Sequence, residues 1–330
     1  MHNRNLGPFS VSALGLGCMN VAMGYGDLPT DDEAGHLFNC ALDAGYTFFD
    51  TAAMYGMGRS ESILGRFMSH RRDQFVLASK CGIFKNDEGQ TEINGRPEVL
   101  MRTCEESLKR LNTEAIDLYY LHRIDPNVPL EESVGALSIM VEQGKVQTIG
   151  LSEVSSKSLR LAHDIHPITA VQSEYSLWSR TPERKMLDTC RQLGITFVPF
   201  SPLARQFLTG RCPTMEHMSD DDLRRSISRP RFEPANFAKN QGLLKPFGEV
   251  AEELGLTMAQ LALAWLLAQE DLIPIPGTKN SDHLMENAAA GDVKLDAQTV
   301  SRLDRMINDE IVCGRRYTDT LMTTTDSEKD

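Results

Sequence analysis

Four titratable residues stand at, or just after, the ends of short apolar runs. Asp50 ends the run YTFF, Lys80 ends FVLAS and His122 ends IDLYYL, while Tyr55 follows Asp50 on a glycine-rich stretch. Each has an ordinary alternative role, since Asp caps turns, Lys can end a strand in solvent and His can be a satisfied rim residue. If successive parallel strands end in these groups, however, their side chains meet at one edge of a sheet, where active sites form.

The combination of a phenol, an ammonium, a carboxylate and an imidazole suits proton transfer to a carbonyl oxygen. A tyrosine has a reference pKa of about 10 and is a weak proton donor at neutral pH. A neighbouring Lys80 ammonium is expected to lower the pKa of Tyr55, and Asp50 would keep that lysine charged and in place. His122 could orient the substrate oxygen or share the proton transfer. Because no side chain supplies a hydride, this chemistry requires a nicotinamide cofactor.

Eight apolar runs alternate with segments of helical periodicity along the whole chain. Helix signals include a capping box over residues 30–33 and Pro97 in the first turn of a helix. Eight strand–helix units in 330 residues predict an α/β fold, a (β/α)8 TIM barrel. A doubly wound dinucleotide fold is disfavoured, because the Gly-x-Gly pairs at 15–17 and 56–58 lack the third glycine of its fingerprint. The predicted strands cover residues 13–18, 46–49, 75–80, 116–122, 146–152, 169–174, 195–201 and 272–277.

Three segments fall outside this repeat, within what we interpret as a single domain over residues 1–330. Gly7-Pro8 predicts a turn, and so an N-terminal hairpin beneath the barrel. Residues 203–241, after the seventh strand, are rich in Arg, Asp and Pro, as expected of a lid or binding loop. Residues 311–330 end in DSEKD and are predicted to be a C-terminal extension with the character of a flexible tail.

The composition argues against several classes of partner and location. A net charge of −12 disfavours nucleic acid and anionic membranes as partners. We find no signal peptide and no apolar run of about 20 residues, and the longest candidate, residues 258–269, is typical of a core helix. Seven cysteines without a C-x-x-C pair fit a reducing, cytoplasmic location. His163 and His166 have no further ligand close in sequence, so no metal site is predicted.

The candidate catalytic residues lie within longer segments that resemble a known family. FFDTAAMYGMGRSESILG contains Asp50 and Tyr55, LASKCGIF contains Lys80, and DLYYLHRIDPNVPLEESV contains His122. GKVQTIGLSEVS, AVQSEYSLWSR, VPFSPLARQFLTG and LIPIPGTKNSDHLMENAAA follow in order. Together they resemble the aldo-keto reductase superfamily from about residue 6 to residue 310, in the bacterial, fungal and plant branch of pyridoxal-reductase-like and auxin-induced-protein-like enzymes. The resemblance implies NADPH-dependent reduction of aldehydes or ketones to alcohols.

The resemblance also implies a role for each matching residue. Asp50, Tyr55, Lys80 and His122 are the expected catalytic tetrad, with Tyr55 as the general acid. The cofactor NADPH is expected to span the barrel mouth, from the tetrad to the last strand. Its expected contacts are Asp50, Ser152 and Gln172 at the nicotinamide end, Phe200 stacked on the ring, Ser201, Leu203, Arg205 and Gln206 at the pyrophosphate, Gly277, Thr278, Lys279 and His283 at the 2′-phosphate, and Glu286 and Asn287 at the adenine.

The chain departs from the family pattern at a few of these positions. Glu153 stands where many members carry Asn, although this branch often has Glu. Ala204 and Gln206 replace glycines of the pyrophosphate loop, which could alter how closely the backbone approaches the phosphates. Asn280 and His283 stand where a further basic residue is common, which bears on how strongly NADPH is preferred over NADH.

The substrate is expected to be a small or xenobiotic carbonyl compound. The resemblance places Met54, Phe84, Arg123 and Trp178 around the substrate, in an apolar and adaptable pocket; simple packing is the alternative for each. A non-catalytic barrel that binds NADPH as a regulatory subunit is the main alternative function, and a barrel that uses Lys80 as a Schiff-base nucleophile is another. The sequence does not distinguish a monomer from a homo-oligomer.

Overall fold

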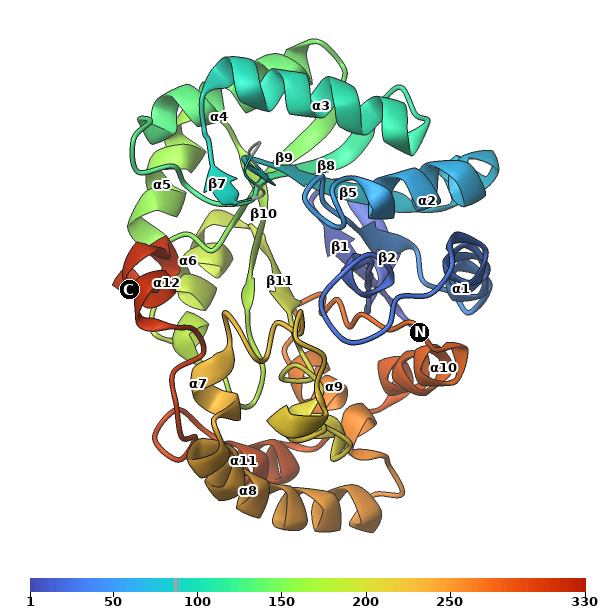
Figure 1. Cartoon of the computed structure of the whole chain (residues 1–330), viewed down its shortest axis with the longest axis vertical. Helices are drawn as coiled ribbons and strands as arrows, with labels where there is room; N and C mark the ends of the chain where they lie inside the picture. Colours follow the sequence, from blue (N-terminus) through green and yellow to red (C-terminus); the bar gives the residue numbers. More distant parts are fainter. Residues whose placement is uncertain (86–87, 89) are drawn as a thin grey trace.

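The computed structural model describes residues 1–85, 88 and 90–330. Seven parallel strands form one curved sheet in the middle of the molecule, in the order β3-β4-β5-β8-β9-β10-β11, and helices surround it (Figure 1). Strand–helix repetition of this kind builds parallel sheets, and the predicted barrel architecture is confirmed. The strands are β3 (Leu16–Gly17), β4 (Phe48–Asp50), β5 (Val76–Cys81), β8 (Ile116–Leu121), β9 (Val146–Ser152), β10 (Ile168–Glu174) and β11 (Thr196–Phe200).

The eighth position of the barrel is filled by residues 272–277, which form an isolated bridge rather than the strand expected from the sequence. The two isoleucine N–H groups of this segment donate to β11 carbonyls at 3.1 and 3.0 Å. On its other side, the two proline carbonyls accept from the N–H groups of Gly15 and Gly17, at 2.9 and 3.2 Å. The prolines have no N–H to return, so only half of that ladder forms. The segment thus closes the barrel by donating to β11 on one side and by accepting from Gly15 and Gly17 on the other.

The N-terminal hairpin closes the bottom of the barrel, as predicted. Its strands, β1 (Asn3–Leu6) and β2 (Phe9–Ser12), pair antiparallel across the turn at Gly7-Pro8. Leu6 and Val11 of the hairpin belong to the same apolar cluster as the inward-facing strand residues. The hairpin therefore shields the barrel interior from water. The other buried members of this cluster are Phe48, Ala78, Leu118, Tyr120, Ala170, Val198, Ile273 and Ile275.

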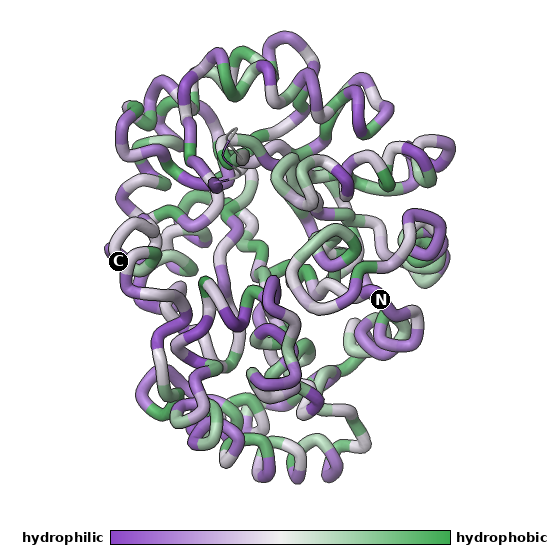
Figure 2. Tube along the Cα trace, viewed as in Figure 1, coloured by the Kyte–Doolittle hydropathy of each residue, from purple (hydrophilic) through white to green (hydrophobic). Residues whose placement is uncertain are grey.

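Helices cover the outside of the barrel, and hydrophobic and hydrophilic residues are interspersed along them (Figure 2), as expected of helices that bury one face. The predicted capping box is present, because Thr30 Oγ1 accepts from the Glu33 N–H (3.3 Å) and the Glu33 carboxylate accepts from the Thr30 N–H (2.8 Å). The helices are α1 (Asp31–Asp43), α2 (Arg59–Met68), α3 (Pro97–Leu111), α4 (Leu130–Glu142), α5 (Ser156–Ile165), α6 (Met186–Leu193), α7 (Arg229–Phe232), α8 (Pro234–Glu253), α9 (Met258–Leu267), α10 (Ser281–Ala289), α11 (Ala297–Met306) and α12 (Asp319–Thr324).

The segment after β11 is more ordered than the loop predicted over 203–241. The helix α8 already begins at Pro234, so the last part of the predicted loop is helical. Phe232 and Phe237 are buried in the main core, where their rings lie 6.1 Å apart. Sequence reasoning did not identify these two phenylalanines as core residues because charged residues flank them in the sequence. A second element that the sequence did not indicate is the hairpin of β6 (Ile83–Lys85) and β7 (Thr91–Ile93), which follows β5.

The C-terminal residues 311–330 differ from the flexible tail expected from the sequence. They contain α12 and a 3-10 turn at Asp326–Lys329, and they lie against the barrel beside α5 and α6 (Figure 1). Arg316, Asp326 and Ser327 of this segment are buried. Their partners are backbone and carboxylate groups of the barrel, so the polar composition of the segment reflects specific hydrogen bonds and not only solvation.

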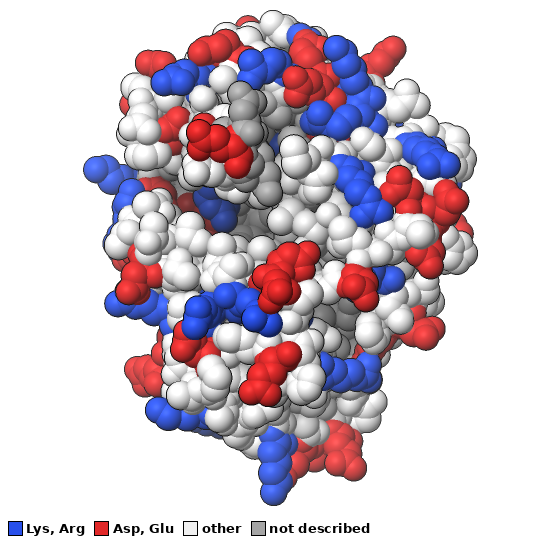
Figure 3. Space-filling model, viewed as in Figure 1, with Lys and Arg blue, Asp and Glu red and all other residues white. Residues whose placement is uncertain are grey.

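Acidic and basic side chains are interspersed over the face of the molecule in Figure 3. The seven cysteines are all unpaired. Among the described residues no single helix has the length and apolar character of a membrane span, although α8 and α9 together, bent by 81°, satisfy that test.

Candidate active site

Neighbouring strands place three of the four predicted catalytic side chains. Asp50 is the last residue of β4, Lys80 lies in β5, and His122 directly follows β8. Since β4 pairs with β5 and β5 with β8, the three groups emerge side by side at the carboxyl-terminal end of the barrel. All three are at least nine-tenths buried.

Tyr55 reaches the same place from the turn between β4 and α2. Residues 56–58 of this turn have positive φ angles of 59°, 55° and 88°. Gly56 and Gly58 adopt this left-handed conformation without a Cβ penalty. A Cβ at Gly56 would also lie 2.9 Å from the Ala22 carbonyl oxygen. The glycines are therefore needed to turn the chain sharply behind Tyr55 and into α2.

Lys80 is the centre of the hydrogen-bond network. Its Nζ donates to Asp50 Oδ1, to the Thr51 carbonyl (2.8 Å) and to the Tyr55 hydroxyl (3.3 Å). Gln172 Nε2 donates to the second Asp50 oxygen at 2.7 Å. The imidazole of His122 stands perpendicular to the Tyr55 ring, with ring centroids 5.9 Å apart. The structure thus brings together all four residues of the predicted tetrad.

Burial controls the protonation states of these groups. It lowers the pKa of Lys80, but the Asp50 carboxylate more than offsets that effect, so the Lys80 pKa is raised and the ammonium stays charged. Burial, together with the charges of Lys80 and Arg123, holds the pKa of His122 well below its usual range, so the imidazole is neutral. Burial raises the pKa of Tyr55, and the Lys80 charge opposes this only in part. The sequence-based expectation that the pKa of Tyr55 is lowered is therefore wrong, and Tyr55 is a protonated phenol.

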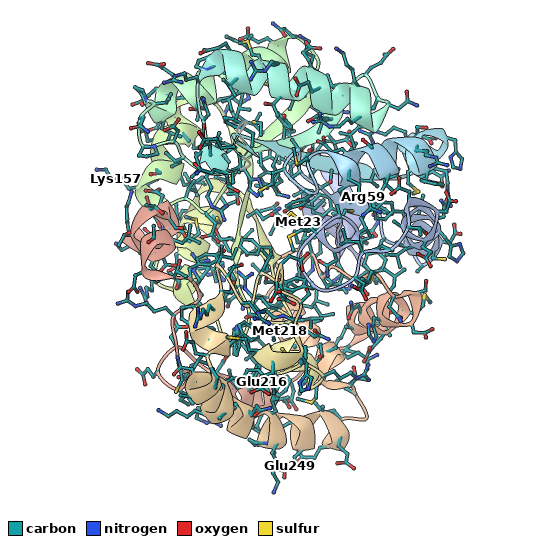
Figure 4. All side chains as sticks on the ribbon, in the orientation of Figure 1. Met23, Arg59, Lys157, Glu216, Met218 and Glu249 are labelled. Atoms are coloured by element: carbon teal, nitrogen blue, oxygen red, sulfur yellow. The ribbon has the colours of Figure 1, made fainter. Side chains whose placement is uncertain are left out.

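The tetrad opens into a cavity of about 1810 Å³. This exceeds the roughly 300–1,000 Å³ of pockets for drug-sized ligands, so there is room for a dinucleotide and a second molecule. In Figure 4, Met23 from the loop after β3 and Met218 from the loop after β11 lie on opposite sides of the middle of the molecule; both line the cavity. All fourteen predicted cofactor positions line it as well: Asp50, Ser152, Gln172, Phe200, Ser201, Leu203, Arg205, Gln206, Gly277, Thr278, Lys279, His283, Glu286 and Asn287.

Ser152 and Gln172 are positioned to present polar groups beside the tetrad. They are register partners on β9 and β10, so their side chains share one face of the sheet. Both are buried. Ser152 Oγ accepts from Arg123 Nη1 at 3.2 Å. A hydroxyl and an amide at this place fit the predicted role of holding a carboxamide.

The loop after β11 lacks two glycines of the family pattern, but its backbone keeps the left-handed conformation that glycine favours. Ala204, Arg205 and Gln206 have φ angles of 52°, 54° and 77°, all in the left-handed region. The backbone N–H groups of Arg205 and Gln206 donate to no acceptor in the described chain, which suits an anion. The Arg205 guanidinium, however, is held by Glu174 at 2.8 Å. We therefore infer that this loop would bind an anion through its backbone N–H groups and not through the side chain of Arg205.

The amino end of α10 forms the far end of the cavity. Asn280 caps this helix, since its Oδ1 accepts from the N–H groups of Asp282 (2.8 Å) and His283 (3.0 Å). Lys279 Nζ donates to the carbonyls of Tyr25 (2.8 Å) and Asp27, which ties the loop after β3 to this end. A helix amino terminus beside a lysine is a fitting place for a phosphate.

Two of the four predicted substrate residues line the cavity and two do not. Met54 and Arg123 line it. Trp178 is fully buried, with its indole stacked on Phe207 at 4.2 Å. That prediction is corrected, because the aromatic anchors of the loop after β11 enclose the indole. Phe84 is half-buried on β6 and lies outside the cavity lining, which the hairpin supplies through Ile83, Thr91 and Ile93.

Two lining residues were not named individually by sequence reasoning, which placed only the segments that carry them, the loop over 203–241 and the tail after Asn308, near the substrate. Arg211 extends from the loop after β11 to α10, where its Nη1 lies 3.3 Å from His283 Nε2. Tyr317 lines the cavity from the C-terminal segment. Arg316 beside it pairs with Glu153 at 2.5 Å.

Comparisons with known proteins agree with this fold. The model of the aldo/keto reductase family matches residues 13–308. Probable aldo-keto reductase 1 of Glycine max is 42% identical over 311 residues, which cover 94% of this chain and 89% of that protein. An aldo/keto reductase from Klebsiella pneumoniae, crystallised with NADP and acetate, is 27% identical with a TM-score of 0.73, over 96% of this chain and 98% of its own. The glycerol dehydrogenase AKR11B4 from Gluconobacter oxydans shares the fold, with a TM-score of 0.84 at 24% identity, over 98% and 96% of the two chains. The chain therefore belongs to the aldo/keto reductase family of oxidoreductases, which act on carbonyl groups.

Proposed function

We propose that this protein reduces aldehyde or ketone carbonyls to alcohols with NADPH, that its substrates are small or xenobiotic carbonyl compounds, and that Tyr55 is the general acid. The observation that carries the proposal is the Lys80 ammonium, which bonds both the Asp50 carboxylate and the Tyr55 hydroxyl (3.3 Å) at the mouth of a large cavity. The family assignment supports the reaction class.

Each member of the tetrad has a definite part in the proton transfer. The raised pKa of Tyr55 keeps the phenol protonated, so it can donate to the oxygen of the carbonyl group as negative charge develops there. Lys80 stabilises the phenolate that remains, and Asp50 keeps Lys80 charged. The neutral His122 can donate a hydrogen bond to the same oxygen and fix its orientation. Asp50, held by Lys80 and Gln172, acts on the reaction through the lysine and through its own charge, which adds to the raised pKa of Tyr55.

The residues of the cavity fit NADPH. When bound, the cofactor supplies the hydride that no side chain can provide. Ser152 and Gln172 would hold its carboxamide, the N–H groups of the loop after β11 would face its pyrophosphate, and the amino end of α10 its 2′-phosphate. Arg211 adds a cation there that offsets the missing basic residues at 280 and 283. The reductase from Klebsiella pneumoniae, crystallised with NADP and with NADPH, supports this choice.

The Tyr55→Phe variant tests the proposed acid. Removing the phenolic proton should lower kcat for aldehyde reduction by about 10²- to 10⁴-fold, the range typical of a lost general acid. NADPH binding, followed by cofactor fluorescence, should change little, because Tyr55 is not among the proposed cofactor contacts. Tyr46→Phe is the matched control: it loses a hydroxyl that donates to the Leu284 carbonyl (3.2 Å), away from the cavity lining.

Wild-type turnover by Tyr55→Phe would show that another group donates the proton. Intact NADPH binding with no reduction of any aldehyde or ketone by the wild-type protein would instead overturn the proposed catalysis. We also propose a cytoplasmic location, which the seven unpaired thiols support.

A further inference from the structure

The cavity beside Tyr55 contains a cation whose partner is not supplied by the described chain. Four arginines line the cavity. Arg205 pairs with Glu174 (2.8 Å), Arg224 with Asp222 (2.6 Å) and Arg211 with Glu286 (4.0 Å). Arg123 has no carboxylate within ion-pair distance among residues 1–85, 88 and 90–330.

The hydrogen bonds of Arg123 use one nitrogen and leave the others available. Its Nη1 donates to the His122 carbonyl (2.6 Å) and to Ser152 Oγ (3.2 Å), which fixes the side chain against two strand ends. Nε and Nη2 donate to no acceptor in the part of the chain that the structure describes. An arginine presents its donors as a planar fork that matches a carboxylate, so the open edge is suited to an anionic group.

Arg123 lies close enough to act on the same substrate as the tetrad. It directly follows His122 in sequence, and its charge contributes to the pKa values of both Tyr55 and His122. One carboxylate in electrostatic contact with Arg123 is Glu153, which is already held by Arg316 (2.5 Å) and by Ser327 Oγ (2.5 Å). Glu153 therefore does not occupy the Arg123 donors.

Part of the lining of this cavity is apolar. Met54, Ile83 and Ile93 line it from the β4 and β6–β7 sides, and Leu321 lines it from α12. Thr91 and Thr325 add hydroxyl groups. An unpaired guanidinium between apolar walls discriminates by charge, because an ion pair is stronger in a partly desolvated site than in water. A neutral substrate would leave that charge unpaired.

We propose that Arg123 is a specificity-determining residue, and that the preferred substrates are aldehydes or ketones with an apolar body that also carry a carboxylate. The carboxylate binds the Nε and Nη2 edge of Arg123 while the carbonyl oxygen meets Tyr55 and His122. The reaction is the one proposed above, so this inference rests on the proposed function: hydride adds to the carbonyl carbon, the C=O π bond breaks, and Tyr55 donates its proton to the oxygen. The carboxylate itself is unchanged.

Matched substrate pairs test the inference directly. We would measure kcat/KM with NADPH for 3- and 4-carboxybenzaldehyde and for their methyl esters, which differ from them mainly in the anionic charge. Wild type should prefer at least one acid over its ester by about ten- to hundredfold, the size expected for a charge-assisted pair. Arg123→Gln should bring the acid-to-ester ratio of kcat/KM to about one, because kcat/KM for the acid falls more than kcat/KM for the ester.

Two further variants separate charge recognition from structural effects. Arg123→Lys keeps the charge without the planar fork and should retain part of the acid preference. Arg305→Gln, on the exposed surface of α11, makes the same charge change outside the cavity and should leave the acid-to-ester ratio unchanged. The dissociation constant of NADPH, followed by fluorescence, should be unchanged in Arg305→Gln, and in Arg123→Gln it reports any effect transmitted to the cofactor through Ser152.

The possible failures can be told apart. If acid and ester lose activity equally in Arg123→Gln, and NADPH binding weakens, Arg123 positions the cofactor through Ser152 and the inference is wrong. If wild type reduces the esters as well as the acids, the site does not select anions. If wild type binds NADPH and reduces neither compound of any pair, the proposed function itself fails.

Discussion

At the scale of single residues, the environment of a side chain decides its protonation state more than its neighbours in sequence do. Tyr55 and Lys80 are close in space, yet burial raises the pKa of the phenol despite the adjacent ammonium. His122 experiences burial and two cations, and all three effects lower its pKa. The site therefore holds a protonated acid next to a neutral imidazole over a broad range of pH.

The pH dependence of reduction follows from these two shifts. Tyr55 must be protonated to donate, so activity is present below its raised pKa and is lost as pH rises through that value, above about 10. His122 must be neutral, and since its pKa is well below the ordinary value of about 6.5, activity should persist to about pH 6. We expect kcat/KM to be nearly flat between about pH 6 and 9.5, measured with freshly mixed NADPH because the cofactor decays in acid.

A fall in kcat/KM centred near pH 7 or 8 would contradict this prediction. It would mean that the Lys80 charge outweighs burial in the catalytic complex and lowers the pKa of Tyr55, as sequence reasoning alone suggested. Tyr55→Phe supplies the control, since its residual activity should not show the decline at high pH.

At the scale of elements, the loop after β11 supplies backbone N–H donors and a cation that the strands do not. Ala204, Arg205 and Gln206 hold three consecutive positive φ angles without glycine. Left-handed backbone costs roughly 1–2 kcal/mol for each such residue. Buried contacts of the same loop offset that cost: Phe207 stacks on Trp178 at 4.2 Å, and Arg205 binds Glu174. Of the two residues that stand in place of glycines, Ala204 is buried and Gln206 accepts from Arg224 Nη1 at 2.8 Å.

The loop after β11 also carries Arg211 to the amino end of α10. From this position we predict that Arg211 favours NADPH over NADH. Arg211→Gln should weaken NADPH binding by about two- to fivefold and leave NADH binding nearly unchanged. The reason is that only NADPH has the 2′-phosphate, and an exposed ion pair contributes about 1 kcal/mol or less. Fluorescence titration with both cofactors gives the ratio of dissociation constants.

Arg229→Gln is a suitable control for that experiment. Arg229 is an exposed arginine at the start of α7, pairs with Glu233 (2.8 Å) and lies outside the cavity lining. Equal weakening of NADPH and NADH by Arg211→Gln would show that Arg211 supports the loop rather than the phosphate.

At the scale of the whole molecule, a buried ionic network joins the C-terminal segment to the barrel. Arg316 binds the Glu153 carboxylate through two nitrogens, at 2.9 and 2.5 Å, and lies 3.7 Å from Glu174. Ser327 also donates to Glu153 (2.5 Å), and Asp326 accepts from the Ser155 N–H (2.8 Å) at the start of α5. The network holds Tyr317 in the wall of the cavity.

Replacement of Arg316 should therefore reduce stability. Arg316→Met leaves Glu153 buried without its main counter-charge, and removing one partner of a buried pair costs about 3–5 kcal/mol. With Arg316 present, the pKa of Glu153 is about 2, so the carboxylate stabilises the fold above its unfolded pKa of about 4.3. In the variant, burial raises that pKa, so protonation removes the unpaired charge as pH falls. The loss of stability, measured by urea unfolding, should be larger at pH 8 than at pH 5.

Arg315→Met is the adjacent control, because Arg315 is exposed and pairs only with the exposed Asp319 (2.9 Å). It should change stability by less than about 1 kcal/mol. A similar, pH-independent loss in both variants would show that the segment is held by packing and not by the buried charges.

Much of this architecture could be predicted because it depends on local signals. The strand that ends in Asp50, the glycines behind Tyr55 and the capping box at Thr30 each rest on periodicity or turn chemistry within a few residues. The hairpin at Gly7-Pro8 is of the same kind. The eighth strand was mispredicted because alternating prolines resemble an apolar strand in pattern but cannot donate to a ladder.

The sequence by itself determined the repeating barrel, the four residues that meet at its mouth and the family to which they belong, because each depends on short motifs in a fixed order. Only the tertiary structure decided three further properties: the raised pKa of Tyr55, the core position of Trp178 and the attachment of the C-terminal segment through Arg316. These depend on which distant groups surround a side chain and exclude water from it. Burial and ion pairing between residues far apart in the chain leave no local pattern to read.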